Sequence, residues 1–95
     1  MVDRKRFSAE YTMFSILEYI YMVRQPVSKY HLLKKVPGIS TQRPDRVSHF
    51  VDMLVKNGYL ETMQTANVMY YQISQKGKDA YDLWIKQFLD FMRSL

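Results

Sequence analysis

The chain has 95 residues, which is enough for one hydrophobic core and too few for two. Hydrophobic residues make up 47% of it, so a packed domain is predicted rather than disorder, and no apolar run is long enough to cross a bilayer. The sequence contains no cysteine, which excludes a disulfide framework and a thiolate metal site, and its net charge is +5.

The excess of basic residues lies in the N-terminal half. Residues 1–47 contain nine Lys and Arg against four Asp and Glu, whereas residues 48–95 contain five against five. This asymmetry is typical of proteins that bind a polyanion, and ordinary solubilising charge explains it equally well. Residues 1–7 form a basic arm with Arg4-Lys5-Arg6, suited to a phosphate backbone or simply to an exposed terminus. The arm lacks the apolar region of a signal peptide, so a cytoplasmic location is predicted.

A first helix is predicted from a cap at Ser8 to about Arg24. Its apolar side chains fall into two sets at helical spacing, one of Met13, Ile16, Leu17 and Ile20 and the other of Tyr11, Phe14 and Tyr21. Two apolar faces indicate contacts on two sides, either with another helix of the chain or with a second subunit.

A short second helix is predicted over Lys29 to Val36, after a break at Gln25-Pro26-Val27 and a cap at Ser28. Its expected apolar contacts are Tyr30, Leu32, Leu33 and Val36. Pro37-Gly38 is a strong turn signal, and Ile39 is expected to pack inside this turn.

A central helix is predicted over residues 42–57, with Ser40 or Thr41 as its cap and Pro44 in its first turn. Its apolar side chains occur three and four residues apart, on one side of the helix: Val47, Phe50, Val51 and Leu54. Asn57-Gly58 ends the helix, because Gly readily adopts the left-handed conformation. Helix, Pro-Gly turn and helix is the order of a helix-turn-helix.

The first half of the central helix carries the candidate nucleic-acid contacts, which are Gln42, Arg43, Arg46, Ser48 and His49. An anchored helix with a basic N-terminal end suits the major groove of DNA. Arg43 and Arg46 are candidates to bind guanine, or they pair with the nearby aspartate or face solvent. Gln42 suits adenine or a capping role, and Ser48 suits a phosphate. His49 faces either the groove or solvent, or is partly buried.

A β-hairpin is predicted next, from Tyr59 to Thr65 and from Val68 to Ser74, with a tight turn at Ala66-Asn67. Leu60, Tyr71 and Ile73 are expected to point inward. Gln64, Thr65, Asn67 and Tyr70 are expected to be exposed near the tip.

The last helix is predicted over residues 75–95, capped by Ser74 and slightly weakened by Gly77. Its apolar residues form a heptad seam of Tyr81, Trp84, Phe88, Phe91 and Leu95, which Ile85, Leu89 and Met92 widen. The seam could fold back on the first helix within one chain. We predict instead that it holds a homodimer, because the apolar surface is large for one small subunit.

The order of predicted elements resembles the winged-helix family, a helix-turn-helix followed by a β-hairpin wing. One motif is D-x-L-V-K-N-G-Y-L-E over Asp52 to Glu61, with Met53 at x, which is similar to the L-x-x-x-G-L/Y-I/L link between recognition helix and wing. The other is Y-Q-I-S-Q-K-G-K over Tyr71 to Lys78, which resembles the Y-x-L-T-x-K-G of MarR-like, PadR-like and small archaeal or archaeal-virus regulators. The likeness covers roughly residues 10–95.

This resemblance implies an α+β, mostly α fold: a single winged helix-turn-helix domain over residues 1–95 with a three-helix core, a two-stranded wing and a long C-terminal helix. It also implies that the helix over residues 42–57 reads the major groove. The wing tip, including Asn67, would lie near the flanking DNA, although it lacks the Lys or Arg that many wings carry there. The second helix would cross the backbone, where Lys29, Lys34 and Lys35 suit phosphates or form a solvated face.

The function expected from these observations is a sequence-specific, homodimeric regulator that binds double-stranded DNA. A non-specific architectural DNA-binding protein and a protein-interaction module are the alternatives. The sequence carries no nucleophile–base signature and no phosphate-binding Gly-rich loop, so no enzyme activity and no cofactor are predicted. His31 and His49 are the only histidines and the chain has no cysteine, so no metal is predicted either. No feature demands a small-molecule effector.

Overall fold

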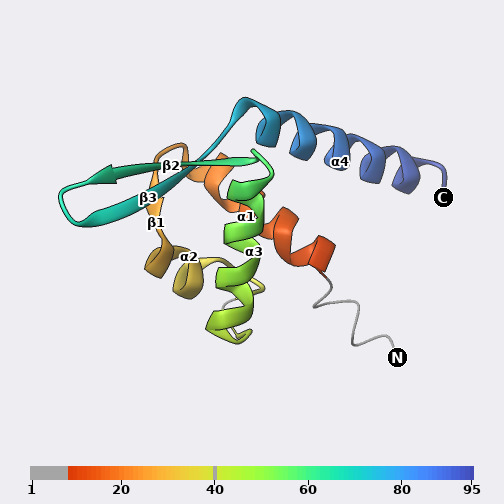
Figure 1. Ribbon diagram of the computed structural model, residues 1–95. Helices are drawn as coiled ribbons and strands as arrows, with labels where there is room; N and C mark the ends of the chain where they lie inside the picture. The colour runs from red at the N-terminus through yellow and green to blue at the C-terminus, as the bar shows by residue number, and fades with distance from the viewer. Residues whose placement is uncertain (1–8, 40) are drawn as a thin grey trace.

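The computed structural model describes residues 9–39 and 41–95 (Figure 1). In this part of the chain, four helices and three strands form an α+β domain that is mostly helical. In chain order they are α1 (Ala9–Val23), β1 (Val27–Ser28), α2 (Lys29–Lys35), α3 (Pro44–Lys56), β2 (Leu60–Thr65), β3 (Val68–Ile73) and α4 (Gln75–Arg93). The expected basic arm and the expected cap at Ser8 lie outside the described residues.

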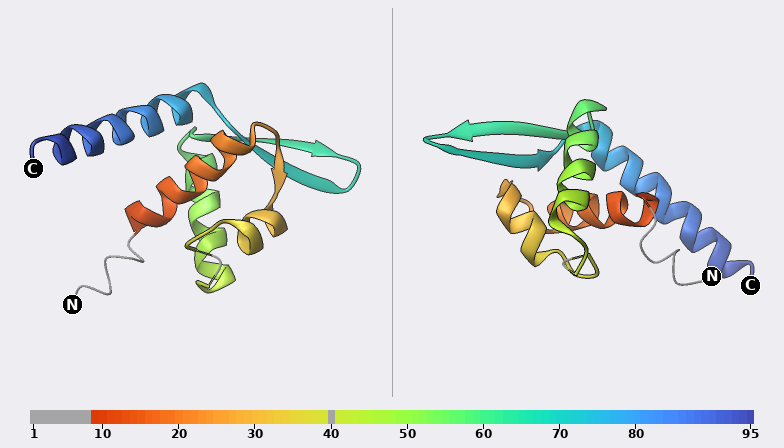
Figure 2. Two further views of the ribbon diagram at one scale, coloured as in Figure 1. Left: turned by 180° about the vertical axis from the view of Figure 1, so that it is seen from behind. Right: turned by 60° about the horizontal axis from the view of Figure 1, so that its bottom comes forward.

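The hydrophobic core forms where α1, α2 and α3 pack together with the base of the sheet (Figures 1 and 2). α1 contributes Ile16, Leu17 and Ile20, and α3 contributes the whole apolar set predicted for it. Leu32 and Val36 complete the contact from α2, and Ile39 is fully buried in the turn, as predicted. Tyr30 was expected in this core and is 70% exposed, because the single buried face of so short a helix is already filled by Leu32.

The sheet has three antiparallel strands in the order β1-β3-β2. β2 and β3 form the predicted hairpin, in register from Leu60↔Ile73 at its base to Thr65↔Val68 at its tip. The hairpin extends away from the helices, as Figure 2 shows. The prediction of only two strands was wrong, because Val27 and Ser28 also pair with β3. Two residues are too few to show an alternating pattern, and Pro26 beside them suggested a break.

The turn before α3 differs from the prediction. Arg43 occupies the N-cap position and makes no side-chain capping bond, so Thr41 is not the cap that was predicted. The alternative cap, Ser40, lies outside the described residues. Pro44 begins the helix at a position that needs no N–H donor. Gly38 and Gly58 both have φ of +84°, which agrees with the predicted turn and helix stop. Gln42 and Arg43 therefore precede the helix instead of lying within it.

α4 packs its first half on α1 of the same chain. The rings of Phe14 and Trp84 stack at 4.7 Å, and the Tyr81 hydroxyl donates to Glu18 at 2.7 Å. Phe14 and Tyr21 of the second apolar face of α1 thus meet α4 within one subunit, whereas Tyr11 is 40% exposed. Tyr81 is only 5% exposed, so its assignment to a dimer interface was wrong. Within residues 9–39 and 41–95, no helix is long and apolar enough to span a membrane.

Candidate nucleic-acid interface

α3 exposes a polar face because its apolar face is fully committed to the core. Val47, Phe50, Val51 and Leu54 are all buried, whereas Arg46 and His49 lie on the exposed side. Ser48 is half-buried at the border between the two sides. The helix can therefore meet a partner along its polar side without losing any core contact.

Gln42 is a positioning residue in this structure. Its side-chain N–H donates to Thr12 Oγ1 at 3.1 Å, and its carbonyl oxygen accepts from Arg46 Nε at 2.9 Å. Since Thr12 is buried in α1, the bond ties the start of α3 to the core. Both polar ends of the Gln42 amide are occupied, so the prediction that it reads adenine does not agree with this conformation.

Arg46 lies at the junction of these contacts. Besides the bond to Gln42, its guanidinium stands over the Phe50 ring at 5.0 Å from the centroid. The Nε bond and the ring fix the orientation of the planar group while the residue stays exposed. Such an arrangement presents a guanidinium with little conformational freedom left to lose on binding.

Arg43 forms an ion pair with Asp45, which the sequence suggested as the alternative to a contact with DNA. Its Nη2 lies 2.9 Å from Asp45 Oδ2, and both side chains are largely exposed. An exposed pair of this kind contributes roughly 0.2–1 kcal/mol, so it can exchange for another anion. Arg43 therefore remains available to a phosphate or a base edge.

The exposed side of α3 also carries two carboxylates, Asp45 and Asp52. Asp52 accepts from Lys29 Nζ at 2.8 Å, which joins α2 to α3. Partial burial lowers the pKa of Lys29, but the hydrogen bond to Asp52 and the neighbouring Tyr71 outweigh it, so the net pKa is raised. Lys29, one of the three lysines predicted to bind phosphate, is thus charged and already paired with Asp52.

Lys34 and Lys35 are exposed in the last turn of α2, where positive charge also favours the helix dipole. His49 is exposed, and its ring centroid lies 5.6 Å from that of Phe50. All three side chains are therefore accessible, as a contact with DNA would require.

The hairpin tip is exposed at Gln64, Thr65 and Asn67, as predicted, whereas Tyr70 was expected to be exposed and is half-buried. Three apolar side chains at the tip, Met63, Val68 and Met69, are each about 40% exposed and were not predicted as site residues. They were assigned to strand formation by their propensity alone. Their exposure could have been predicted, because the sequence offers no further helix or strand to cover the outer part of the hairpin.

The second half of α4 carries the remaining candidate interface. Trp84 is half-buried against Phe14, but Phe88, Phe91 and Leu95 are 49%, 60% and 83% exposed. Figure 1 shows this half of α4 running beyond the rest of the molecule. The first part of the seam, Tyr81 and Trp84, is therefore covered within the chain, whereas Phe88, Phe91 and Leu95 are exposed. These three exposed residues define the open half of α4.

The described residues contain no group of three or more His, Asp or Glu side chains placed to hold a metal ion. A scan against protein-family models found no matching family, and a search of curated proteins found no match.

Proposed function

We propose that this chain is a winged-helix protein that binds double-stranded DNA and regulates transcription as a homodimer. The order α1-β1-α2-α3-β2-β3 with a short first strand beside the hairpin supports this proposal. In it, α3 is the recognition helix and the β2–β3 hairpin is the wing.

The observation that carries the proposal is the exposed guanidinium of Arg46 on a helix anchored along its other side. Its bond to Gln42 and its contact with Phe50 hold it in one orientation. A guanidinium so held suits the paired acceptors of guanine in the major groove. His49, one turn further on, is the neighbouring candidate for a base contact.

The exposed lysines supply the electrostatic part of binding. Lys34 and Lys35 at the end of α2 neutralise phosphates. Arg43 leaves its ion pair with Asp45 and pairs with a phosphate instead. Asp45 and Asp52 repel the phosphates of the DNA backbone and so weaken binding to DNA of any sequence. Discrimination between DNA sequences therefore rests on close contacts with the bases. Apolar side chains and amides at the hairpin tip indicate contact with the sugar edge rather than deep insertion of a cation into the minor groove.

The homodimer forms through the open half of α4 in this proposal. Phe88, Phe91 and Leu95 continue the 3–4 spacing of a seam that pairs with a copy of itself. A two-fold dimer would place its two α3 helices on half-sites separated by about one turn of DNA or a multiple of it.

A protein-interaction module is the second candidate. The two carboxylates on α3, the uncharged hairpin tip and the exposed apolar residues of α4 favour it. It predicts stable association with a protein partner and no retention of duplex DNA at low salt.

Selection from a random-sequence duplex pool at near-physiological salt tests the proposal. Retained sequences enriched in a two-fold motif support a dimeric, specific regulator and give the half-site spacing. Retention without enrichment supports an architectural protein, and no retention at any salt concentration contradicts DNA binding.

A further inference from the structure

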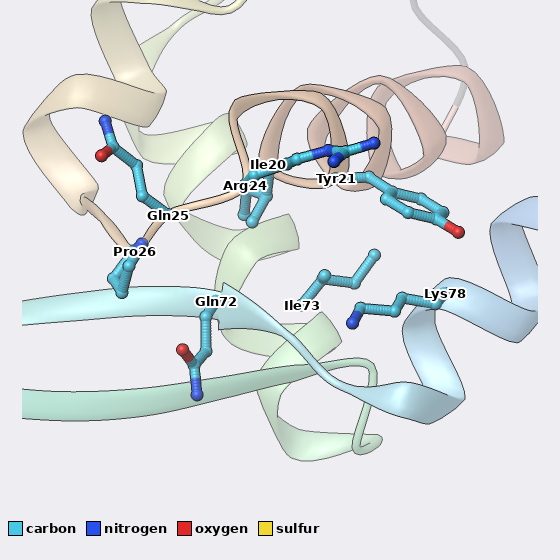
Figure 3. Close-up of a pocket in the computed structure, with 8 residues that line it drawn as sticks. All are labelled: Ile20, Tyr21, Arg24, Gln25, Pro26, Gln72, Ile73 and Lys78. Atoms are coloured by element: carbon cyan, nitrogen blue, oxygen red, sulfur yellow. The ribbon is translucent and has the colours of Figure 1, made fainter.

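A pocket of about 370 Å³ lies where the end of α1, the end of β3 and the start of α4 meet (Figure 3). Its lining residues come from these three elements and from the segment between α1 and β1: Ile20, Tyr21, Arg24, Gln25, Pro26, Gln72, Ile73 and Lys78. None of them belongs to the candidate DNA contacts, and α3 runs behind the pocket in Figure 3. The pocket is therefore a separate feature of the molecule.

One wall of the pocket is apolar. Ile20 is almost fully buried and Ile73 packs against the core, so both hold fixed positions. Pro26 and the ring of Tyr21 extend this surface at the rim. Apolar walls with a few polar groups are typical of sites that take small organic molecules, and the volume suits a single-ring compound.

Two cations, Arg24 and Lys78, contribute to the same pocket. Figure 3 shows the Lys78 ammonium extending from α4 toward Ile73. Arg24 lies beside Tyr21 on the opposite side of the pocket. Within residues 9–39 and 41–95, neither side chain takes part in an ion pair. Arg24 also adopts a left-handed φ of 61°, which costs about 1–2 kcal/mol for a residue other than Gly.

Nearby carboxylates do not occupy these cations. The Tyr21 hydroxyl donates to Asp82 at 3.2 Å, so that carboxylate is directed at the tyrosine. Burial and the charges of Asp82 and Asp79 raise the pKa of Tyr21, which keeps its hydroxyl protonated. An anionic ligand would therefore meet Arg24 and Lys78, whereas the amides of Gln25 and Gln72 point away from the pocket (Figure 3), and that of Gln72 donates to Glu61.

We propose that this pocket binds a small organic carboxylate whose apolar body rests on Ile20 and Ile73 and whose charge lies between Arg24 and Lys78. The inference does not depend on DNA binding, since the pocket shares no residue with α3. A ligand here would touch α1, β3 and α4 together, and so would hold α4 against the core.

Benzoate is the probe for this proposal, with uncharged benzamide as its matched control. Titration of ¹⁵N-labelled full-length protein to millimolar benzoate is expected to shift the amide signals of Ile20, Tyr21, Ile73 and Lys78 in a saturable way. Benzamide is expected to bind at least about fivefold more weakly, because it lacks the charge that the two cations recognise.

Arg24→Gln and Lys78→Gln are each expected to weaken benzoate binding about fivefold, while the spectrum keeps its folded dispersion. Lys86→Gln removes a lysine from an exposed position of α4 outside the pocket and is expected to leave binding unchanged. Equal binding of benzoate and benzamide, or equal binding of inorganic phosphate and benzoate, would overturn the proposal. So would shifts spread over all surface lysines, or unchanged binding in both pocket variants.

Discussion

Gly77 packs directly against the backbone carbonyl of Tyr59. A Cβ at position 77 would lie 2.2 Å from the Tyr59 oxygen and 2.8 Å from Ile73 Cγ1. From the sequence, Gly77 was expected only to weaken the last helix slightly. It is instead the position that lets α4 begin beside the base of the hairpin, where Ser74 caps the helix and donates to the Gly58 carbonyl.

Gly77→Ala is expected to lower the free energy of unfolding by about 3 kcal/mol, since the backbone cannot move away from a methyl group so close. Gly58→Ala is the matched comparison: its φ of +84° is unfavourable, but the added methyl meets only the flexible Lys76 side chain. We expect a loss of about 1 kcal/mol there. Urea denaturation measures both values, and the reverse order would contradict the packing described for Gly77.

The contact between Tyr81 and Glu18 makes stability depend on pH in alkali. Burial and the hydrogen bond to Glu18 raise the pKa of Tyr81 to about 12, whereas an unfolded tyrosine titrates near 10. The folded chain therefore holds this proton more tightly. Its stabilising effect is complete below pH 10 and is lost, by about 2 kcal/mol, as the pH rises to 12.

Tyr81→Phe is expected to remove this fall in stability, which urea denaturation at pH 8 to 11.5 would measure. Tyr30→Phe, at an exposed tyrosine, is the control and is expected to keep the pH dependence of the unaltered protein. Equal pH dependence in Tyr81→Phe and the unaltered protein would show that the contact does not shift the Tyr81 titration.

The open half of α4 gives a matched test of the dimer. Phe91 and Leu83 are exposed to nearly the same extent, 60% and 57%, but only Phe91 lies on the heptad seam. Phe91→Ser is expected to raise the dimer dissociation constant at least about tenfold, because it removes a large apolar contact at each of two equivalent places. Leu83→Ser is expected to have little effect. Sedimentation equilibrium measures both, and a protein that is monomeric without substitution would contradict the proposed dimer.

Arg46 and Lys35 are expected to contribute differently to DNA binding. Arg46→Ala is expected to cost about 1–3 kcal/mol on a selected duplex and to relax preference at one base position. Lys35→Ala is expected to weaken all sequences similarly and to reduce the salt slope by about one. Fluorescence anisotropy over a salt series separates the two effects, with Arg93→Ala at the far end of α4 as the control. Unchanged binding in both variants would contradict the assignment of α3.

Asp52 provides a substitution that is expected to strengthen binding. Asp52→Asn removes a negative charge from the exposed side of α3 and releases Lys29, so duplex affinity is expected to rise by ~0.5 kcal/mol at low salt. Asp90→Asn, which frees Lys86 and Arg93 on α4, is the control and is expected to leave affinity unchanged. A protein-interaction module that uses Asp52 would instead lose partner binding in Asp52→Asn.

The parts of the fold that local patterns encode were predicted well. The apolar spacing of α3, the strand propensities of β2 and β3, and the turn at Pro37-Gly38 agree with the structure. The inward positions of Leu60, Tyr71 and Ile73 agree as well.

The missed features depend on contacts between distant residues. Gln42 was expected at the groove, but a buried Thr12 thirty positions away binds its amide. Tyr81 was assigned to a dimer, although Glu18 and Tyr21 of the same chain surround it. β1 is too short to recognise without its partner, Tyr71. Periodicity indicates which face of a helix is apolar, and only the tertiary fold shows what covers it.

The most direct test of the proposed function is amide shift mapping of ¹⁵N-labelled protein with a selected duplex. We predict that shifts concentrate at Arg43, Arg46 and His49, at Lys34 and Lys35, and around the hairpin tip at Asn67, with smaller changes in the second half of α4. Shifts confined to α4, or absent at every duplex concentration, would contradict the claim that α3 meets DNA.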